Sequence, residues 1–95
     1  MQNLEKYEII RQWIDPEERV TVDFLDEKDV DAAILDGTPN HVDIAIQTAF
    51  PHVKQMVSIP LREIELGEDR QHYTRDPERP LQYRRLRMMI NQKRP

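Results

Sequence analysis

The chain has 95 residues, of which 38% are hydrophobic and 34% charged, so it predicts one small domain with a thin core under a heavily charged surface. It contains no cysteine, which excludes disulfides, thiolate nucleophiles and cysteine-bound zinc. No apolar run approaches the roughly 20 residues that cross a bilayer, and no signal peptide is visible, so we expect a cytoplasmic protein without a membrane partner.

Residues 3–14 predict an amphipathic helix, which the Asp15-Pro16 pair ends. Apolar residues recur at helical spacing: Leu4, Tyr7, Ile10 and Ile14, with Ile9 and Trp13 beside them. This stripe either packs on the core of the same domain or docks a partner helix. We favour packing, because a short helix needs tertiary contacts to persist.

From residue 19 onwards the apolar residues alternate with polar ones, which predicts a meander of short strands over residues 19–66. The strands are expected at 19–26, 30–34, 42–47 and 55–61, with Ile64 and Leu66 continuing the pattern. A short helix is the alternative at 30–34, because alanine favours helices. Pro60 within the fourth run indicates an edge strand or a bend.

The C-terminal third predicts a polar loop, a last strand and a loose end. Residues 67–80 hold glycine and prolines among charged residues, and therefore predict a loop. Alternation over 82–90 predicts a closing strand with an arginine-rich outer face, with a helix as the alternative. Residues 91–95 are expected to fray.

These elements predict a mostly β protein with an N-terminal helix, built as a small SH3-like or Sm-like barrel of about five strands. Closing such a sheet would remove its exposed edges. The stretch from Val57 to Ile64 resembles the Ile-Pro-x-x-x-Ile segment of the ribosome maturation factor C-terminal and PRC-barrel types, and the Asp36-Gly37 turn with Val42 to Ile44 resembles their central hairpin. The resemblance spans residues 4–66 and implies a helix packed on a curved five-stranded sheet. The RNA-binding motifs of Sm proteins are absent.

Charge is distributed unevenly along the chain. The net charge of −4 combines −10 over residues 1–69 with +6 over residues 70–95. The basic segment offers candidate residues for binding nucleic acid or another partner: Tyr73, Arg75, Tyr83, Arg84, Arg85 and Arg87. Arginine pairs with phosphate and tyrosine stacks on bases. The alternative, which we favour, is that Arg85 and Arg87 pair with acidic residues such as Asp23 and Asp43 on adjoining strands.

Other chemistry-bearing residues form no recognised pattern. Asp26, Asp29 and Asp31 lie in an acidic run that is either a divalent-cation site or, as we favour, a solvated turn without the spacing of a calcium loop. His41, His52 and His72 lack the spacing of common zinc ligands, and Ser58 has no flanking glycine or nearby histidine. We therefore expect no enzyme activity and no cofactor.

The function that these observations favour is a non-enzymatic protein-interaction or accessory module. Its expected partner is a protein, and a second copy of the chain, bound through an edge strand or the Trp13 face, is one such partner. Binding of RNA or single-stranded nucleic acid through the basic segment is the first alternative, and regulation by a divalent cation at residues 23–31 is the second.

Overall fold

The computed structural model describes residues 1–72 and 83–95, apart from the side chains of residues 68–72 and 83–85. Helix α1 (Asn3–Ile10) continues into a 3-10 turn, η1 (Arg11–Trp13), and strands follow. Their bounds are β1 (Asp15–Asp23), β2 (Val30–Gly37), β3 (His41–Gln47), β4 (Lys54–Pro60), β5 (Ile64–His72) and β6 (Tyr83–Ile90), with a second 3-10 turn, η2 (Leu61–Glu63), between β4 and β5.

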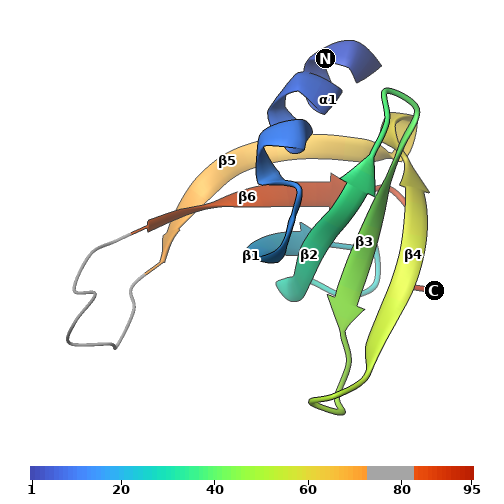
Figure 1. The fold of residues 1–95 in the computed structure, drawn as a ribbon. Coiled ribbons are helices and arrows are strands. Elements are labelled where there is room, and N and C mark those ends of the chain that lie inside the picture. Colours follow the sequence, from blue (N-terminus) through green and yellow to red (C-terminus); the bar gives the residue numbers. More distant parts are fainter. Residues whose placement is uncertain (73–82) are drawn as a thin grey trace.

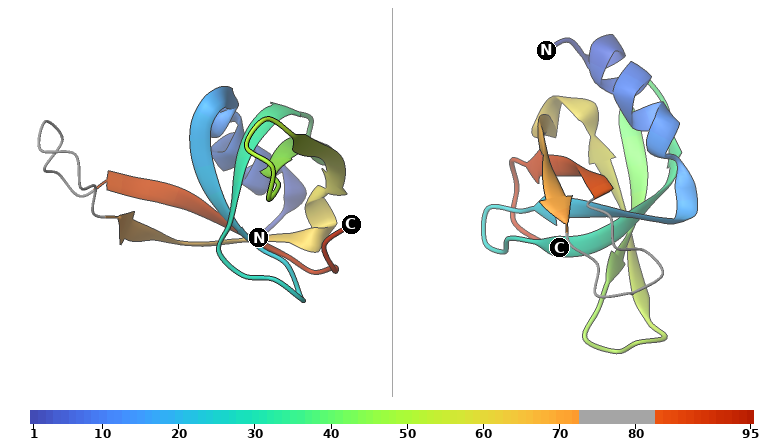
Figure 2. Two further views of the ribbon diagram at one scale, coloured as in Figure 1. Left: turned by 90° about the horizontal axis from the view of Figure 1, so that it is seen from below. Right: turned by 90° about the vertical axis from the view of Figure 1, so that its left-hand side faces the viewer.

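The strands form one six-stranded sheet in the order β4-β3-β2-β1-β6-β5. All neighbouring strands are antiparallel except β1 and β6, which run parallel. The first and the last strand of the chain therefore lie side by side inside the sheet. The sheet curls into a half-barrel, with the β5–β6 hairpin extending beyond the other strands (Figures 1 and 2). The predicted class, mostly β with an N-terminal helix in a small barrel-like sheet, is confirmed. The barrel stays open, however, because β4 and β5 are its two edges.

Apolar residues at every second position of the strands make the core, because successive side chains point to opposite faces of a sheet. Val20, Val22 and Phe24 from β1 and the turn after it lie inside with Ile44 and Met88, and none of these five is exposed to solvent. Burying each large apolar side chain stabilises the fold by roughly 1.5–3 kcal/mol, and the sum of these contributions is the main stabilising term of such a core.

Helix α1 lies over one end of the curled sheet (Figure 1). Ile10 is fully buried there, while Tyr7 and Trp13 pack against the core from its rim. Lys6 is also buried, and its Nζ donates a hydrogen bond of 3.0 Å to the carbonyl of Leu61 in η2. The predicted packing of the helix on its own domain is therefore observed, although Leu4 and Ile9 remain exposed.

Several predicted elements differ from the structure. The helix predicted over 3–14 ends as an α-helix at Ile10 and continues as a 3-10 turn to Trp13, and the strand predicted at 19–26 spans Asp15–Asp23. The alternative helix at 30–34 is wrong, because Val30–Gly37 pairs on both sides as β2. The polar loop predicted over 67–80 is wrong for residues 67–72, which extend β5 by pairing with β6, as in Gly67↔Arg87 and His72↔Tyr83. The sequence of residues 67–72 is charged and has no apolar alternation, so it does not indicate a strand. The strand forms because its backbone pairs with that of β6. Residues 73–80 lie outside the described residues.

The C-terminal tail, predicted to fray, is held against the body. The Leu25 amide donates to the carbonyl of Gln92 at 3.0 Å, and the amide of Arg94 donates to the Asp26 carboxylate at 2.8 Å. The Gln55 side chain donates to the carbonyl of Pro95 at 3.0 Å. Sequence composition could not show these contacts, because they depend on where β6 delivers the tail.

Candidate functional site

Arg87, one of the six candidates in the basic segment, lies in a buried ion-pair group. Its guanidinium contacts the carboxylate of Asp23 directly and that of Asp29 at 3.1 Å. Arg87 and Asp23 are each only 8% exposed. The pairing of Arg87 with Asp23 was the favoured alternative to a ligand-binding role, and the structure shows it.

Local structure assembles this group. Arg87 is opposite Thr21 in the parallel β1–β6 pair, which places it one step from Asp23 on the same face of the sheet. Asp29 has a φ of 55°, a left-handed conformation that aspartate tolerates better than most residues. This geometry lets the Asp29 amide donate to the Asp23 carboxylate at 2.9 Å while its own carboxylate meets Arg87.

The ion-pair group sets the protonation of Asp23. Burial by itself would raise the pKa of this carboxyl. The hydrogen bonds from the Asp29 amide and the Arg87 guanidinium, with the attraction of Arg87 and Lys28, outweigh burial and hold the pKa below its ordinary value of 3.8. Asp23 is thus a structural anion matched to Arg87.

The acidic turn between β1 and β2 is occupied by arginines from the C-terminal segment. Asp26 accepts the Arg94 amide, Glu27 pairs with the Arg94 guanidinium, and Asp29 pairs with Arg87. Within the part of the chain that the structure describes, no three histidine, aspartate or glutamate side chains are grouped to hold a metal ion. Asp26 and Asp29 therefore act as acceptors for the chain's own arginines.

The remaining candidates in the basic segment are placed only in part. Tyr73 and Arg75 lie outside the described residues. Tyr83, Arg84 and Arg85 lie on β6, where their backbones pair with His72, Gln71 and Arg70 of β5, and their side chains are outside the described part. Arg87 alone of the six candidates is fully placed, and the acidic turn already engages it.

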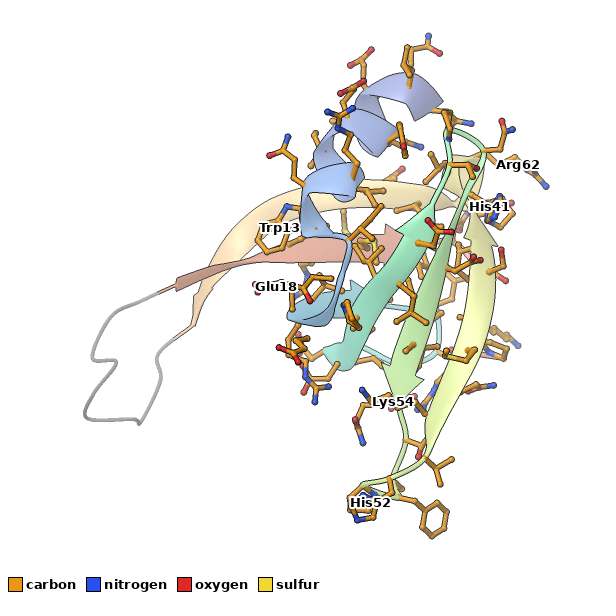
Figure 3. All side chains as sticks on the ribbon, in the orientation of Figure 1. Trp13, Glu18, His41, His52, Lys54 and Arg62 are labelled. Atoms are coloured by element: carbon orange, nitrogen blue, oxygen red, sulfur yellow. The ribbon has the colours of Figure 1, made fainter. Side chains whose placement is uncertain are left out.

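The other polar candidates are not brought together. His41 lies at one end of the β3–β4 hairpin and His52 at the opposite tip (Figure 3). The nearest acidic group to His41 is the Asp43 carboxylate, 3.8 Å from the imidazole. Ser58 is exposed in β4. These positions form no nucleophile–base pair among the described residues.

The β4 edge, by which we mean Lys54–Pro60 and its unpaired backbone side, is one of the two open edges of the sheet. Leu61 directly follows β4, and Asn40 directly precedes β3. The Leu61 amide donates to the Asn40 carbonyl at 2.9 Å, so the backbone of Leu61 points towards β3. Because backbone groups alternate in direction along a strand, Gln55, Val57 and Ile59 also point towards β3. The N–H and C=O groups of Lys54, Met56 and Ser58 therefore point outwards, away from the sheet.

Exposed apolar side chains accompany this edge. Phe50 is 70% exposed, Val53 53% and Met56 65%, and all three lie on β4 or the turn that leads into it. Natural edge strands are normally protected by charges, bulges or proline. β5 fits that description, because its sequence contains Glu65, Glu68, Asp69 and Arg70 and its pairing shifts register between Gly67 and Arg70. β4 carries one charge, Lys54, and one proline, Pro60 at its end, and its pairing with β3 is regular.

The sequence indicated this edge only through Pro60. Proline in the predicted fourth strand suggested an edge or a bend, and the structure shows an edge strand whose last residue is Pro60. The exposed side chains of Phe50 and Met56 had no distinct signal, because alternation alone does not say which face of a strand another element covers.

A second surface feature lies near the helix. An open hollow of about 300 Å³ is lined by Gln12, Trp13, Asp15 and Glu18, and Trp13 and Glu18 are seen on the side of the molecule away from His52 (Figure 3). The indole of Trp13 also packs against the core, so its presence here has a structural reason.

Comparison with known proteins gives no match to a protein-family model, a curated protein or a solved structure. The resemblance to SH3-like and Sm-like barrels accordingly stays a prediction. In the described residues, no helix has the length and apolar character to span a membrane.

Proposed function

We propose that this protein is a non-enzymatic interaction module that binds a protein partner through the β4 edge. The observation that carries the proposal is the combination of outward backbone groups at Lys54, Met56 and Ser58 with exposed apolar side chains beside them. An added strand would satisfy the backbone groups, and apolar contacts with Met56 would stabilise it.

The charge layout supports this proposal over nucleic-acid binding. Arg87 and Arg94 pair with the acidic turn at Asp23–Asp29, so part of the basic segment serves the fold itself. On the outer side of β4, in contrast, no described strand pairs with the backbone, since β4 is the last strand of the sheet, and the described tail contacts this strand through the Gln55 side chain and Pro95.

The test is capture of proteins from the native host with tagged protein in three forms. Met56→Lys places a charge in the centre of the edge, and Leu25→Lys makes the same change at an exposed apolar position on the β1–β2 turn. We expect wild type and Leu25→Lys to enrich the same protein, which includes untagged copies of this chain, and Met56→Lys to lose it. If wild type enriches no protein, or if Met56→Lys captures as much as wild type, the proposal fails.

A further inference from the structure

We propose that the partner of the β4 edge is a second copy of this chain, paired antiparallel about a two-fold axis at Met56, so that two half-barrels share one continuous sheet. This inference rests on the proposed function, because it names the partner of the same edge. It adds an occupant, a register and a set of contacting residues.

The backbone of the edge is complementary to itself in this register. With the axis at Met56, Lys54 faces Ser58 of the second copy and Met56 faces Met56 of the second copy. All outward N–H and C=O groups of these residues then form antiparallel pairs. If the axis moves to Val57, Pro60 faces Lys54 of the second copy, and the Lys54 carbonyl has no donor because proline lacks an N–H.

Charges are complementary in the same register. Ser58 pairs with Asp43 on β3, so Lys54 of one copy lies two strands from Asp43 of the other, a distance of about 10 Å between Cα atoms. Only the small Ser58 side chain lies between them on that face, and the long lysine side chain spans it. In a single copy, the ion-pair partner of Asp43 among the described residues is His41. In the dimer, Asp43 is also an acidic neighbour of the Lys54 ammonium of the second copy.

The apolar side chains are also matched. Met56 pairs with Ala45 on β3, which is buried. In the dimer, the two Met56 side chains meet between the two Ala45 residues, which forms a short apolar row across the joined sheets. Cross-strand apolar pairs of this kind stabilise a sheet, whereas like charges placed directly opposite each other destabilise it. No like charges face each other in this register.

The first experiment measures the mass of the purified protein by sedimentation equilibrium over a range of concentrations. We expect wild type and Leu25→Lys to form dimers with the same dissociation constant. In Met56→Lys two lysines face each other at the axis, which raises that constant by roughly 100-fold. Circular dichroism confirms that each variant is folded. A wild-type protein that stays monomeric at millimolar concentration overturns the inference.

The second experiment reads the register with single cysteines, which is straightforward because the chain has none of its own. Met56→Cys is expected to cross-link to itself with dibromobimane, a reagent that joins only closely spaced thiols, since residues in a hydrogen-bonded pair have Cα atoms about 5.5 Å apart. Lys54→Cys and Ser58→Cys are expected to cross-link when mixed but not alone, because each lies about 14 Å from its own counterpart.

The outcomes separate this inference from the proposed function. A mixture of Met56→Cys and Ser58→Cys that cross-links faster than Met56→Cys alone places the axis at Val57 and overturns the register. A monomeric wild type that still captures another protein, with loss in Met56→Lys, overturns the dimer and leaves the proposed function standing. A monomer that captures nothing overturns both.

Discussion

Arg87 lies where an alternating strand would place a solvent-exposed side chain, yet its guanidinium is buried between two carboxylates. A buried arginine is tolerated only when its charge is matched, because removing a lone charge from water costs several kcal/mol. Asp23 supplies the match from β1 and Asp29 adds a second carboxylate from the turn. Arg87, one of the candidate ligand-binding residues, is therefore part of the fold.

The ion pair predicts how stability depends on pH. The Asp23 pKa is lower in the folded chain than in the unfolded one, so its contribution is present above about pH 4 and is lost as the pH falls through the folded value. We expect Asp23→Asn to lower the free energy of unfolding by about 3 kcal/mol at pH 7, because it leaves Arg87 without its main partner. Urea unfolding at a series of pH values measures this difference.

The difference between wild type and Asp23→Asn should shrink as the pH falls below 4, since the wild-type carboxyl then becomes neutral as well. Glu17→Gln, at an exposed position, serves as the control and is expected to change stability by less than about 0.5 kcal/mol. A difference between wild type and Asp23→Asn that is constant from pH 7 to pH 2 would contradict the role assigned to the Asp23 charge.

Lys6 gives a second prediction for a single residue. Its ammonium donates to the carbonyl of Leu61, and this bond ties α1 to η2. We expect Lys6→Met to lower the free energy of unfolding by about 1–3 kcal/mol, because the methionine fits the apolar stem of lysine but leaves the carbonyl unpaired. Thermal and urea unfolding measure the loss, and Lys93→Met, at an exposed position, should leave stability unchanged.

Among the elements, β4 differs from the other edge strand because it is regular in its pairing and charged only at Lys54. The outer side of β4 presents a row of unpaired backbone donors and acceptors. Such a row can pair with a strand of another chain. The chain leaves this row open and protects β5 with charges and a register shift.

The alternation along β4 predicts two classes of amide exchange. In a monomeric sample, such as dilute Met56→Lys, the amides of Gln55, Val57 and Ile59 bond to β3 and should exchange slowly with solvent deuterium. Those of Ser58 and Lys54 point outwards and should exchange fast. Hydrogen exchange followed by nuclear magnetic resonance resolves the individual amides. Equal protection of both classes would show that the outward direction of Ser58 and Lys54 is wrong.

For the whole molecule, sequence periodicity was sufficient to predict the helix, the meander and the fold class. The side chains that carry the pattern, from Val20 to Ile46, occupy the core that the alternation implied. The parallel pairing of β1 with β6 and the open barrel were not predictable in this way, because both depend on contacts between distant parts of the chain. In the sequence, only Pro60 indicated that β4 is an edge strand. The exposure of Phe50 could not be predicted, because it depends on how the strands assemble into the sheet.

Ion pairs within the molecule partly neutralise the uneven charge of the chain, because Arg94 pairs with Glu27 and Arg87 with Asp29 in the acidic turn. We expect Arg94→Ala to lower the free energy of unfolding by about 0.5 kcal/mol at low ionic strength, since its contact with Glu27 is partly exposed. The loss should decrease in 1 M sodium chloride, because salt screens such pairs. Urea unfolding of both proteins at the two salt concentrations checks this, and Arg94→Lys should retain part of the contact.

The position of β1 between β2 and β6 has a consequence for biosynthesis. While the ribosome is still making the chain, β1 through β5 emerge before β6, so the middle of the sheet is incomplete and Asp23 has no guanidinium beside it. A nascent chain that has not yet released Tyr83–Ile90 therefore exposes a four-stranded sheet with open edges at β1 and β4, and a β5 segment without a pairing strand. Folding to the final architecture has to wait until translation of this last strand is complete, which makes the growing polypeptide a natural client for chaperones.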